Sequence, residues 1–256
     1  MADVRTAIAN KPAWVDLSSA DPAASRAYYA KLFGWDIQVT PDPQYGGYAI
    51  AKLGGRDVAG IGPKQSPEAP TSWNIYIGAD NAAALADKVQ AAGGRVIMPA
   101  FDVGDQGRMA VFQDPSGAFI SAWQPRNMAG AEYMAGTNTF GWAELNARGL
   151  DKAIPFYTQV FGWTTKTSQG AQPYTEFQLN GQSIAGGMEM NPMMPPQVPS
   201  YWMAYFTVED VDAAFRTATD AGGREMLAPQ DFPGGRFAIV NDPQGAAFGL
   251  LGMQQR

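Results

Sequence analysis

The chain repeats itself at about half of its length, and this repeat constrains the fold more than any other feature. Trp14-Val15-Asp16-Leu17 reappears 128 residues later as Trp142-Ala143-Glu144-Leu145. Three further segments recur in the same order at nearly the same offset: Tyr29…Phe33-Gly34-Trp35 with Tyr157…Phe161-Gly162-Trp163, Ala92-Gly93-Gly94-Arg95 with Ala221-Gly222-Gly223-Arg224, and Asp114-Pro115-Ser116-Gly117 with Asp242-Pro243-Gln244-Gly245. A tandem duplication predicts two domains, 1–128 and 137–256, joined by a small, polar segment.

Each half divides again into two units of the pattern β-α-β-β-β. Asp21-Pro22 predicts a helix start, with Asp as the N-cap and Pro in the first turn. The run 73–77 predicts the first strand of the second unit, and 81–92 its helix, which Gly93-Gly94 ends. Strand-like runs then lie at 47–53, 58–62, 95–98, 109–113 and 118–123. Pro155 must lie early in its helix or kink it.

Together these segments resemble the vicinal oxygen chelate superfamily, which includes glyoxalase I, extradiol dioxygenases, fosfomycin-resistance enzymes and bleomycin-resistance binding proteins. The similarity rests on the strand-Asp-helix-Tyr-Tyr-x-x-x-Phe-Gly-Trp opening, the second strand-Asp-Asn-helix-Ala-Gly-Gly unit and the Asp-Pro-x-Gly turn, each present twice or nearly so. The resemblance implies an α+β fold of four βαβββ modules. These would form two curled mixed-sheet half-barrel cups with helices outside and a site inside each cup.

The resemblance also implies where metal ligands would stand, usually His and Glu. Those positions hold Trp14, Asn74 and Ser121 in the first half, Trp142, Met203 and Gly249 in the second, and Gly60 and Gly186 on the short strands. None of these is a strong ligand for a divalent metal, and the chain contains neither His nor Cys. We therefore expect no metal and no cofactor, which argues against metal-dependent glyoxalase or dioxygenase activity.

Strand alternation predicts which side chains face each cup. Asp16 and Glu144 are candidates for a general acid or base, assisted by Tyr76 or Tyr205. In a purely structural alternative, Asp16 and Glu144 form buried ion pairs with the duplicated Arg108 and Arg236. A third interpretation, Mg²⁺ or Mn²⁺ held by a lone carboxylate, lacks converging oxygen ligands.

Aromatic and polar side chains supply the predicted ligand contacts, because binding pockets are mostly apolar with a few polar anchors. Trp73 and Trp202 fit either ligand stacking or the core. Glu176 has no acidic counterpart in the first half, where Ile50 stands. The predicted ligand-binding residues are Trp14, Tyr48, Asn74, Arg108, Ser121, Trp142, Tyr174, Glu176, Met203 and Arg236.

Residues 188–203 are unusually rich in methionine and proline. They contain five of the 12 methionines: Met188, Met190, Met193, Met194 and Met203. Because methionine side chains adapt to irregular apolar surfaces, we predict a lid over the second pocket. Binding of Cu(I) by the thioethers is the alternative.

Charge and hydropathy limit the partners. A net charge of −6 disfavours nucleic acid, and the sequence has no 18-residue apolar stretch that would cross a membrane. The polar segment 1–14 lacks the apolar core of a signal peptide, so we expect a cytoplasmic monomer or homodimer. We predict acid–base chemistry on a small, partly aromatic organic molecule: an isomerisation, elimination or cyclisation. The alternative is a protein that binds and sequesters a small molecule or antibiotic without turnover.

Overall fold

A computed structural model describes residues 9–170 and 173–254 of the chain. Residues 1–8 lie outside this part, and they make up most of the N-terminal segment in which we expected no signal peptide. The helices are α2 (Pro22–Phe33), α3 (Leu85–Ala91), α4 (Leu150–Phe161) and α5 (Val211–Asp220), with a short 3₁₀ turn at Pro43–Tyr45. None of the described helices is long and apolar enough to cross a membrane.

The strands form two eight-stranded mixed sheets with the same order. The first has the order β2-β3-β4-β1-β5-β8-β7-β6 and the second β10-β11-β12-β9-β13-β16-β15-β14. The first sheet contains β1 (Pro12–Ser19), β2 (Asp36–Val39), β3 (Ala49–Leu53), β4 (Arg56–Pro63), β5 (Ser72–Gly78), β6 (Arg95–Val103), β7 (Gly107–Gln113) and β8 (Phe119–Pro125). The second contains β9 (Thr139–Ala147), β10 (Thr164–Thr167), β11 (Tyr174–Leu179), β12 (Gln182–Glu189), β13 (Tyr201–Thr207), β14 (Arg224–Phe232), β15 (Gly235–Asn241) and β16 (Ala247–Met253).

Four βαβββ modules therefore follow one another, and the predicted α+β fold class is confirmed. In each half, the first and last strands of a module pair in parallel, as β1 does with β4 and β13 with β16. The remaining pairs within a module are antiparallel hairpins, such as β3 with β4. A parallel pair needs a long crossover, and the helix and hairpin of each module provide it.

The helix ends follow the capping residues. Asp21 Oδ1 accepts the backbone N–H groups of Ala23 and Ala24 at 3.1 and 3.0 Å, so α2 begins where it was predicted. The α4 helix has no capping side chain of its own, and Glu189 from β12 accepts the N–H groups of Gly149 and Leu150, each at 2.8 Å. Pro155 lies inside α4.

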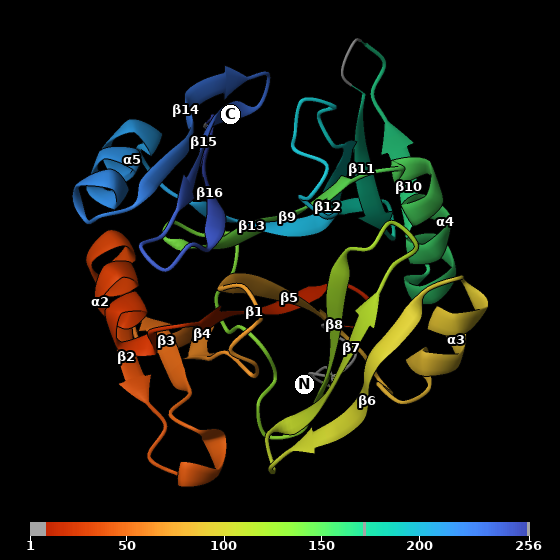
Figure 1. The fold of residues 1–256 in the computed structure, drawn as a ribbon, viewed down its shortest axis with the longest axis horizontal. Helices are drawn as coiled ribbons and strands as arrows, with labels where there is room; N and C mark the ends of the chain where they lie inside the picture. Colours follow the sequence, from red (N-terminus) through yellow and green to blue (C-terminus); the bar gives the residue numbers. More distant parts are fainter. Residues whose placement is uncertain (1–8, 171–172, 255–256) are drawn as a thin grey trace. The chain divides into compact units, whose positions relative to one another are not determined.

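Contacts divide the chain into two compact units, and each unit combines modules from both halves. One unit holds Ile75–Gly130 and Ala143–Trp202 with the chain up to Trp14, so that α3 packs on α4 (Figure 1). The other holds 15–74, 131–142 and 203–256, so that α2 packs on α5. The division into domains 1–128 and 137–256 stays a prediction.

A buried Trp–Tyr–Asp chain joins the two modules inside each unit. Tyr29 Oη donates to Asp242 Oδ2 at 3.0 Å and accepts a hydrogen bond from Trp73 Nε1 at 2.9 Å. Asp242 also accepts two backbone N–H groups of its own turn. The Asp-Pro-x-Gly turn found in the sequence thus fastens a helix of another module.

The other unit repeats this chain with Trp202, Tyr157 and Asp114. Trp202 Nε1 donates to Tyr157 Oη at 2.7 Å, and Tyr157 Oη donates to Asp114 Oδ2 at 2.8 Å. Burial first, and then the charge of the aspartate, raises the pKa of both Tyr29 and Tyr157 well above the usual value. Trp73 and Trp202 are therefore core residues. Of the two interpretations of these tryptophans, ligand stacking or the core, the structure supports the core.

Candidate functional site

A polar cluster centred on Asp16 lies on the first half's sheet. Asp16 stands in β1 opposite Gly60 of β4, and it is 8% exposed. Tyr48 Oη donates to Asp16 Oδ2 at 3.2 Å, and Asn74 Nδ2 donates to Asp16 Oδ1 at 2.8 Å. Both carboxylate oxygens therefore accept a hydrogen bond, which offsets part of the cost of burying the carboxylate.

Asn74 links this carboxylate to a second residue of β1. Its Nδ2 also donates to Ser18 Oγ at 2.9 Å. Because alternate residues of a strand share a face, Ser18 lies on the same side of β1 as Asp16. Asp16 and Asn74 therefore lie on the same face of the sheet. Sequence reasoning missed Ser18, although its spacing from Asp16 signals the shared face.

Tyr48 lies against the face of β4 on which Gly60 and Gly62 leave no side chains. A Cβ atom on Gly60 would lie 1.8 Å from Tyr48 Oη, and one on Gly62 would lie 2.7 Å from Tyr48 Cδ2. Neither glycine has a positive φ, so the backbone conformation does not require glycine at these positions. Glycine is required there because the Tyr48 ring needs the space. Tyr48 was predicted as a ligand contact, and in the structure it is a hydrogen-bond partner of Asp16.

Glu144 occupies the equivalent position in the second half. It stands in β9 opposite Gly186 of β12 and is 9% exposed. Asn146 Nδ2 donates to Glu144 Oε1 at 3.3 Å. Burial, and then the charge of Glu144, raises the pKa of the nearby Tyr201.

The second cluster differs from the first in its surroundings. Tyr174, the counterpart of Tyr48, stands opposite Met188, which takes the place of Gly62. Glu176 stands opposite Gly186 and accepts a hydrogen bond from Ser183 Oγ. The counterpart of Asn74 is Met203, whose apolar side chain is buried.

The other predicted site residues lie on the remaining strands. Tyr76 of β5 stands opposite Ser121 of β8, and both are buried. Tyr205 of β13 lies over Gly249, where a Cβ atom would be 2.0 Å from Tyr205 Cδ1. Trp14 is buried and Trp142 partly so. A catalytic role for Tyr76 and Tyr205, and ligand binding by the others, stay predictions.

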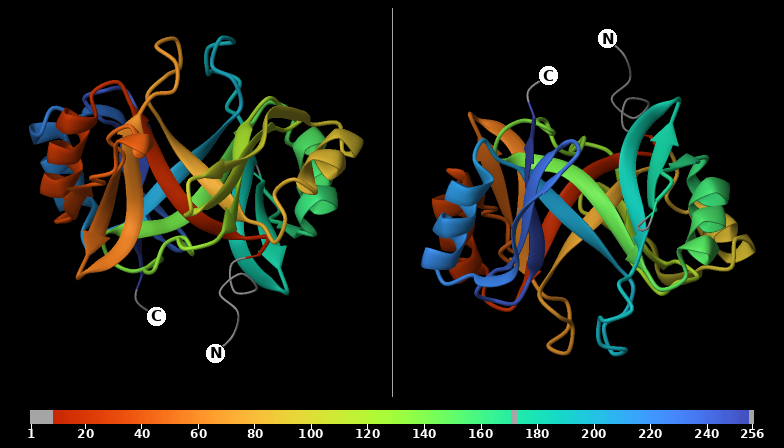
Figure 2. Two further views of the ribbon diagram at one scale, coloured as in Figure 1. Left: turned by 90° about the horizontal axis from the view of Figure 1, so that it is seen from below. Right: turned by 90° about the horizontal axis from the view of Figure 1, so that it is seen from above.

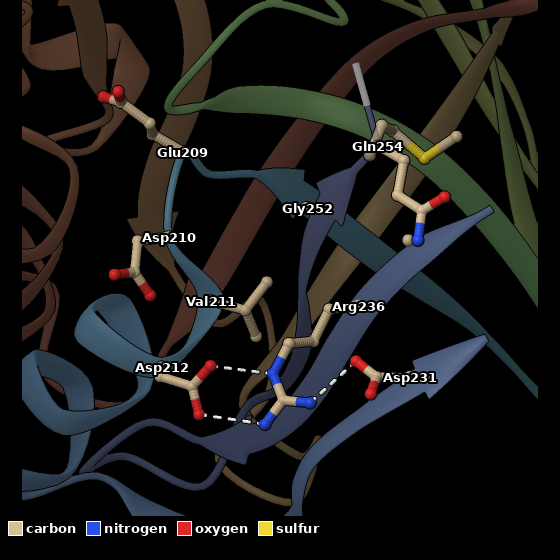
Figure 3. A pocket seen from close by; sticks show the side chains of 10 residues that line it. Glu209, Asp210, Val211, Asp212, Asp231, Arg236, Gly252 and Gln254 are labelled. Atoms are coloured by element: carbon tan, nitrogen blue, oxygen red, sulfur yellow. Dashed lines mark hydrogen bonds and ion pairs between the residues drawn. The ribbon is translucent and has the colours of Figure 1, made fainter. Parts of the chain in front are cut away.

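The two predicted arginines pair with carboxylates of their own modules. Arg108 Nε lies 2.8 Å from Asp102 Oδ1. Arg236 forms a bidentate pair with Asp212, at 2.7 and 3.0 Å, and a further bond to Asp231 at 2.7 Å (Figure 3). The partners are thus Asp102, Asp212 and Asp231 in place of the expected Asp16 and Glu144, so the structural alternative was wrong about the partners.

A hollow of about 360 Å³ surrounds Arg236, lined by acidic residues at the start of α5 and by the end of β16 (Figure 3). All three guanidinium nitrogens of Arg236 donate hydrogen bonds to Asp212 or Asp231. Three of the five N–H groups of this guanidinium are thus used within the module, and its charge is compensated by two carboxylates.

The residues at the family's metal-ligand positions do not fit a divalent cation. Trp14 and Gly60 supply no ligand atom, and Ser121 supplies one neutral hydroxyl. The Asn74 amide is directed at Asp16 and Ser18. Among residues 9–170 and 173–254, no group of three His, Cys, Asp or Glu side chains is placed to hold a metal ion.

Arg148, which follows β9, holds the methionine-rich segment. Its guanidinium donates to the backbone carbonyls of Met194, Pro195 and Val198 at 3.0, 2.7 and 3.2 Å. Met193, within this loop, is 88% exposed and Met190 is buried, so these two thioethers lie in different environments. The loop projects away from the strands of its own module (Figure 2). Its roles as a lid or a copper site stay predictions.

The sequence profile of the Glyoxalase/Bleomycin resistance protein/Dioxygenase superfamily matches residues 11–121 and again 139–250. The chain belongs to this superfamily. Both matches coincide with the two eight-stranded sheets, which confirms the tandem arrangement and the resemblance seen in the sequence.

Relatives of similar length match nearly the whole chain. CFP32 of Mycobacterium tuberculosis, whose name describes it as a glyoxylase, is 42% identical over 247 residues, 94% of each chain. The anthracycline biosynthesis protein DnrV of Streptomyces peucetius is 36% identical over 260 residues, 95% of this chain and 94% of DnrV.

Solved structures share the fold at low sequence identity. The Mn(II)-bound glyoxalase of Novosphingobium aromaticivorans has a TM-score of 0.67 and 18% identity, covering 95% of this chain and 82% of the other. The 2,3-dioxygenase LapB of Pseudomonas sp. KL28 also has a TM-score of 0.67, with 14% identity and coverage of 96% and 92%. At this identity the likeness concerns the fold alone.

Proposed function

We propose that this protein is a metal-independent enzyme that acts on a small, partly aromatic organic molecule by acid–base chemistry, with Asp16 as the group that transfers the proton. The observation that carries the proposal is the Asp16 cluster. A buried carboxylate has one oxygen bound to the hydroxyl of Tyr48 and the other to the amide of Asn74. This arrangement combines a proton acceptor with an adjacent proton donor.

The cluster suits removal of a proton from carbon next to a carbonyl group. Asp16 takes that proton, and the amide of Asn74 donates a hydrogen bond to the oxygen that becomes negatively charged. Return of the proton to another carbon gives an isomerisation, and loss of a leaving group gives an elimination. Attack of the carbanion on a second carbonyl of the same molecule gives a cyclisation.

Two further observations support this proposal. The residues at the family's metal-ligand positions do not fit a divalent metal, so the polarising role falls to hydrogen-bond donors. One relative, 36% identical, carries the name of an anthracycline biosynthesis protein, and anthracyclines are polycyclic aromatic compounds. Glu144 is a second candidate for the same chemistry, with Asn146 and Tyr201 near it.

Exchange of carbon-bound hydrogen for deuterium tests the proposal without knowledge of the natural substrate. Aryl 1,3-diketones and aryl ketones in D₂O are incubated with the protein, and proton NMR follows the loss of the α C–H signal. We expect catalysed exchange that Asp16→Asn lowers by at least about a hundredfold. Glu144→Gln, with its unfolding curve measured, is the matched control for the second cluster.

The outcome also decides between enzyme and binding protein. If the compounds bind and shift the melting temperature but no exchange exceeds that of buffer, the acid–base role is refuted. Sequestration without turnover then becomes the function. If Glu144→Gln abolishes exchange and Asp16→Asn does not, the catalytic centre is assigned to the second half. Stoichiometric divalent metal in the purified, active protein would contradict metal independence.

A further inference from the structure

We propose that the bare stretch of β4 at Gly60 and Gly62 is a binding slot for a phenolic ring, and that Tyr48 occupies this slot while no ligand is bound. The inference rests on the proposed function only in placing a ligand at Asp16. It adds the chemical class of that ligand, a hydroxylated aromatic, and the side chain that the ligand must displace.

The geometry of Tyr48 shows what the slot accepts. Beyond its Cβ, the side chain of tyrosine is a phenol. Its ring lies so close to β4 that added Cβ atoms at Gly60 and Gly62 would overlap it, at 1.8 Å and 2.7 Å. Its hydroxyl reaches Asp16 Oδ2 at 3.2 Å. The slot therefore already holds a flat aromatic ring over bare backbone, with a hydroxyl hydrogen-bonded to a carboxylate.

The carboxylate dictates the polar group of the ligand. An ionised carboxylate only accepts hydrogen bonds, so a ligand that replaces Tyr48 at Asp16 must donate one. A phenol does so, whereas the corresponding methyl ether does not. A buried carboxylate oxygen that is left without a hydrogen-bond donor costs free energy. The site should therefore discriminate strongly between a phenol and its methyl ether.

Tyr48 can leave the slot by rotation of its side chain alone. The residue lies just before β3, and its backbone is fixed by two hydrogen bonds: its N–H donates to the Tyr45 carbonyl, and its own carbonyl accepts from Thr40 N–H. The ring is only partly buried. Rotation about the side-chain bonds therefore exposes the glycine stretch without breaking the pairing of β3 with β4.

The second half lacks this slot. Its equivalent strand carries Met188 where the first half has Gly62, and Tyr174 stands directly opposite that methionine. A side chain already projects from the strand there, so a ring cannot lie on bare backbone. The slot thus belongs to the first half, where Asp16 lies.

Replacement of Tyr48 by a small residue provides the test. In Tyr48→Ala the missing group is a phenol; p-cresol is that phenol with one added methyl group, and 4-methylanisole is p-cresol with its hydroxyl blocked. We expect isothermal titration to show p-cresol binding at least about tenfold more tightly than 4-methylanisole, the size of one hydrogen bond to a charged group. Wild-type protein should bind p-cresol more weakly than Tyr48→Ala, because Tyr48 competes for the slot.

Two double variants assign the binding to the slot. Tyr48→Ala with Asp16→Asn should lose the preference for the hydroxyl. Tyr48→Ala with Gly62→Ala should lose binding of both compounds. The three atoms nearest to the new Cβ all belong to the Tyr48 ring, which that variant lacks, so the added methyl group has space in the unliganded protein. Equal affinity of Tyr48→Ala for the two compounds, or undiminished binding when Gly62 is alanine, would overturn the proposal.

A measurement on the wild-type chain covers the case in which Tyr48→Ala fails to fold. With ¹³C-labelled tyrosine, and with the Tyr48 signal assigned from Tyr48→Phe, saturating p-cresol should move that ring signal while 4-methylanisole at equal concentration leaves it unchanged. An unmoved Tyr48 signal overturns the proposal. The deuterium-exchange assay remains independent: exchange that needs Asp16, without discrimination between the two compounds, keeps the acid–base function and removes the slot.

Discussion

At the scale of single residues, Tyr29 and Tyr157 each join the two modules of one unit through a single hydroxyl. Tyr29 bridges the Trp73 indole and the Asp242 carboxylate, and both partners are buried. Tyr29→Phe should lower the free energy of unfolding by about 2–4 kcal/mol, because the substitution leaves a buried carboxylate and an indole N–H each without this partner. Urea unfolding followed by tryptophan fluorescence measures the change.

The neighbouring Tyr28 provides the matched control. It is also buried, but its hydroxyl makes a longer bond, 3.3 Å, to the Ala218 carbonyl. Tyr28→Phe should therefore cost about 1 kcal/mol or less. Equal losses for the two variants would show that the Trp–Tyr–Asp chain has no special role in stability.

The raised tyrosine pKa values predict a loss of stability in alkali. Burial raises the pKa of Tyr28, Tyr29 and Tyr157 in the folded chain above the usual value of 10.0. Above about pH 10 the unfolded chain releases protons that the folded chain retains, so the free energy of unfolding falls as pH rises. This contribution is fully present below that pH. We expect urea unfolding between pH 8 and 11 to show the fall, with a smaller slope for the Tyr29→Phe, Tyr157→Phe double variant than for the wild type.

The Asp16 site shows which contacts a sequence can predict. Strand alternation is sufficient to place residues two apart, such as Asp16 and Ser18 of β1, on one face, because the period of a strand is fixed. The contact of Tyr48 with Asp16 was not predictable in that way, because it depends on a ring crossing two glycines on the strand between them. The arginines were assigned wrong partners because a long side chain selects among several carboxylates within reach, here Asp102, Asp212 and Asp231.

At the scale of elements, Arg148 fixes the loop between β12 and β13. Three carbonyls of the loop accept from one guanidinium, and the loop also carries internal bonds from Met194 N–H to the Asn191 carbonyl and from Val198 N–H to the Pro195 carbonyl. Arg148→Ala should raise the hydrogen-exchange rates of these two amides at least about tenfold, with β9 and α4 unchanged. Exchange read by mass spectrometry measures this.

Arg148→Lys is the matched variant for that experiment. An ammonium group keeps the charge but lacks the planar fork that reaches several carbonyls at once. It should restore only part of the protection. Unchanged exchange in both variants would mean that the prolines alone order the loop, and that the bonds of Arg148 contribute little.

Elements with strong local signals were predictable, and weakly patterned ones were not. The α2 helix began at the predicted Asp21-Pro22 because capping is decided by neighbouring residues. The α3 helix is shorter than the predicted 81–92, since Asn81 accepts the N–H groups of Ala83 and Ala84 and forms a turn before the helix begins at Leu85. The strand β2 carries mostly exposed residues and therefore no clear hydrophobic alternation.

At the scale of the whole molecule, the repeat predicted the modules, but their grouping depended on tertiary contacts. Each sheet uses strands of one half of the sequence, while each compact unit combines modules of both halves. The deciding contacts join residues of different halves: Tyr29 and Asp242 are 213 positions apart, and Tyr157 and Asp114 are 43 apart. No local pattern encodes such a pairing, so the sequence alone could not distinguish pairing within a half from pairing across halves.

This grouping predicts how separated halves behave. A chain cut near Gly130 separates Tyr29 from Asp242 and α2 from α5. It also separates Tyr157 from Asp114 and α4 from α3. Each half then exposes helix faces and aromatic rings that are buried in the intact chain, so we expect neither 1–130 nor 131–256 to be a folded monomer. Co-expressed, the two fragments should purify as a one-to-one complex with the circular dichroism spectrum of the intact chain.

Sedimentation and thermal unfolding of each fragment give the decisive comparison. A Tyr29→Phe substitution in the first fragment should weaken the complex, because the hydroxyl contributes directly to the contact between fragments; Tyr28→Phe should weaken it less. A single fragment that sediments as a monomer and unfolds cooperatively would instead establish 1–128 and 137–256 as independent domains. The repeat would then mark two self-sufficient folding units, and the contacts that cross between halves would only join domains that are already folded.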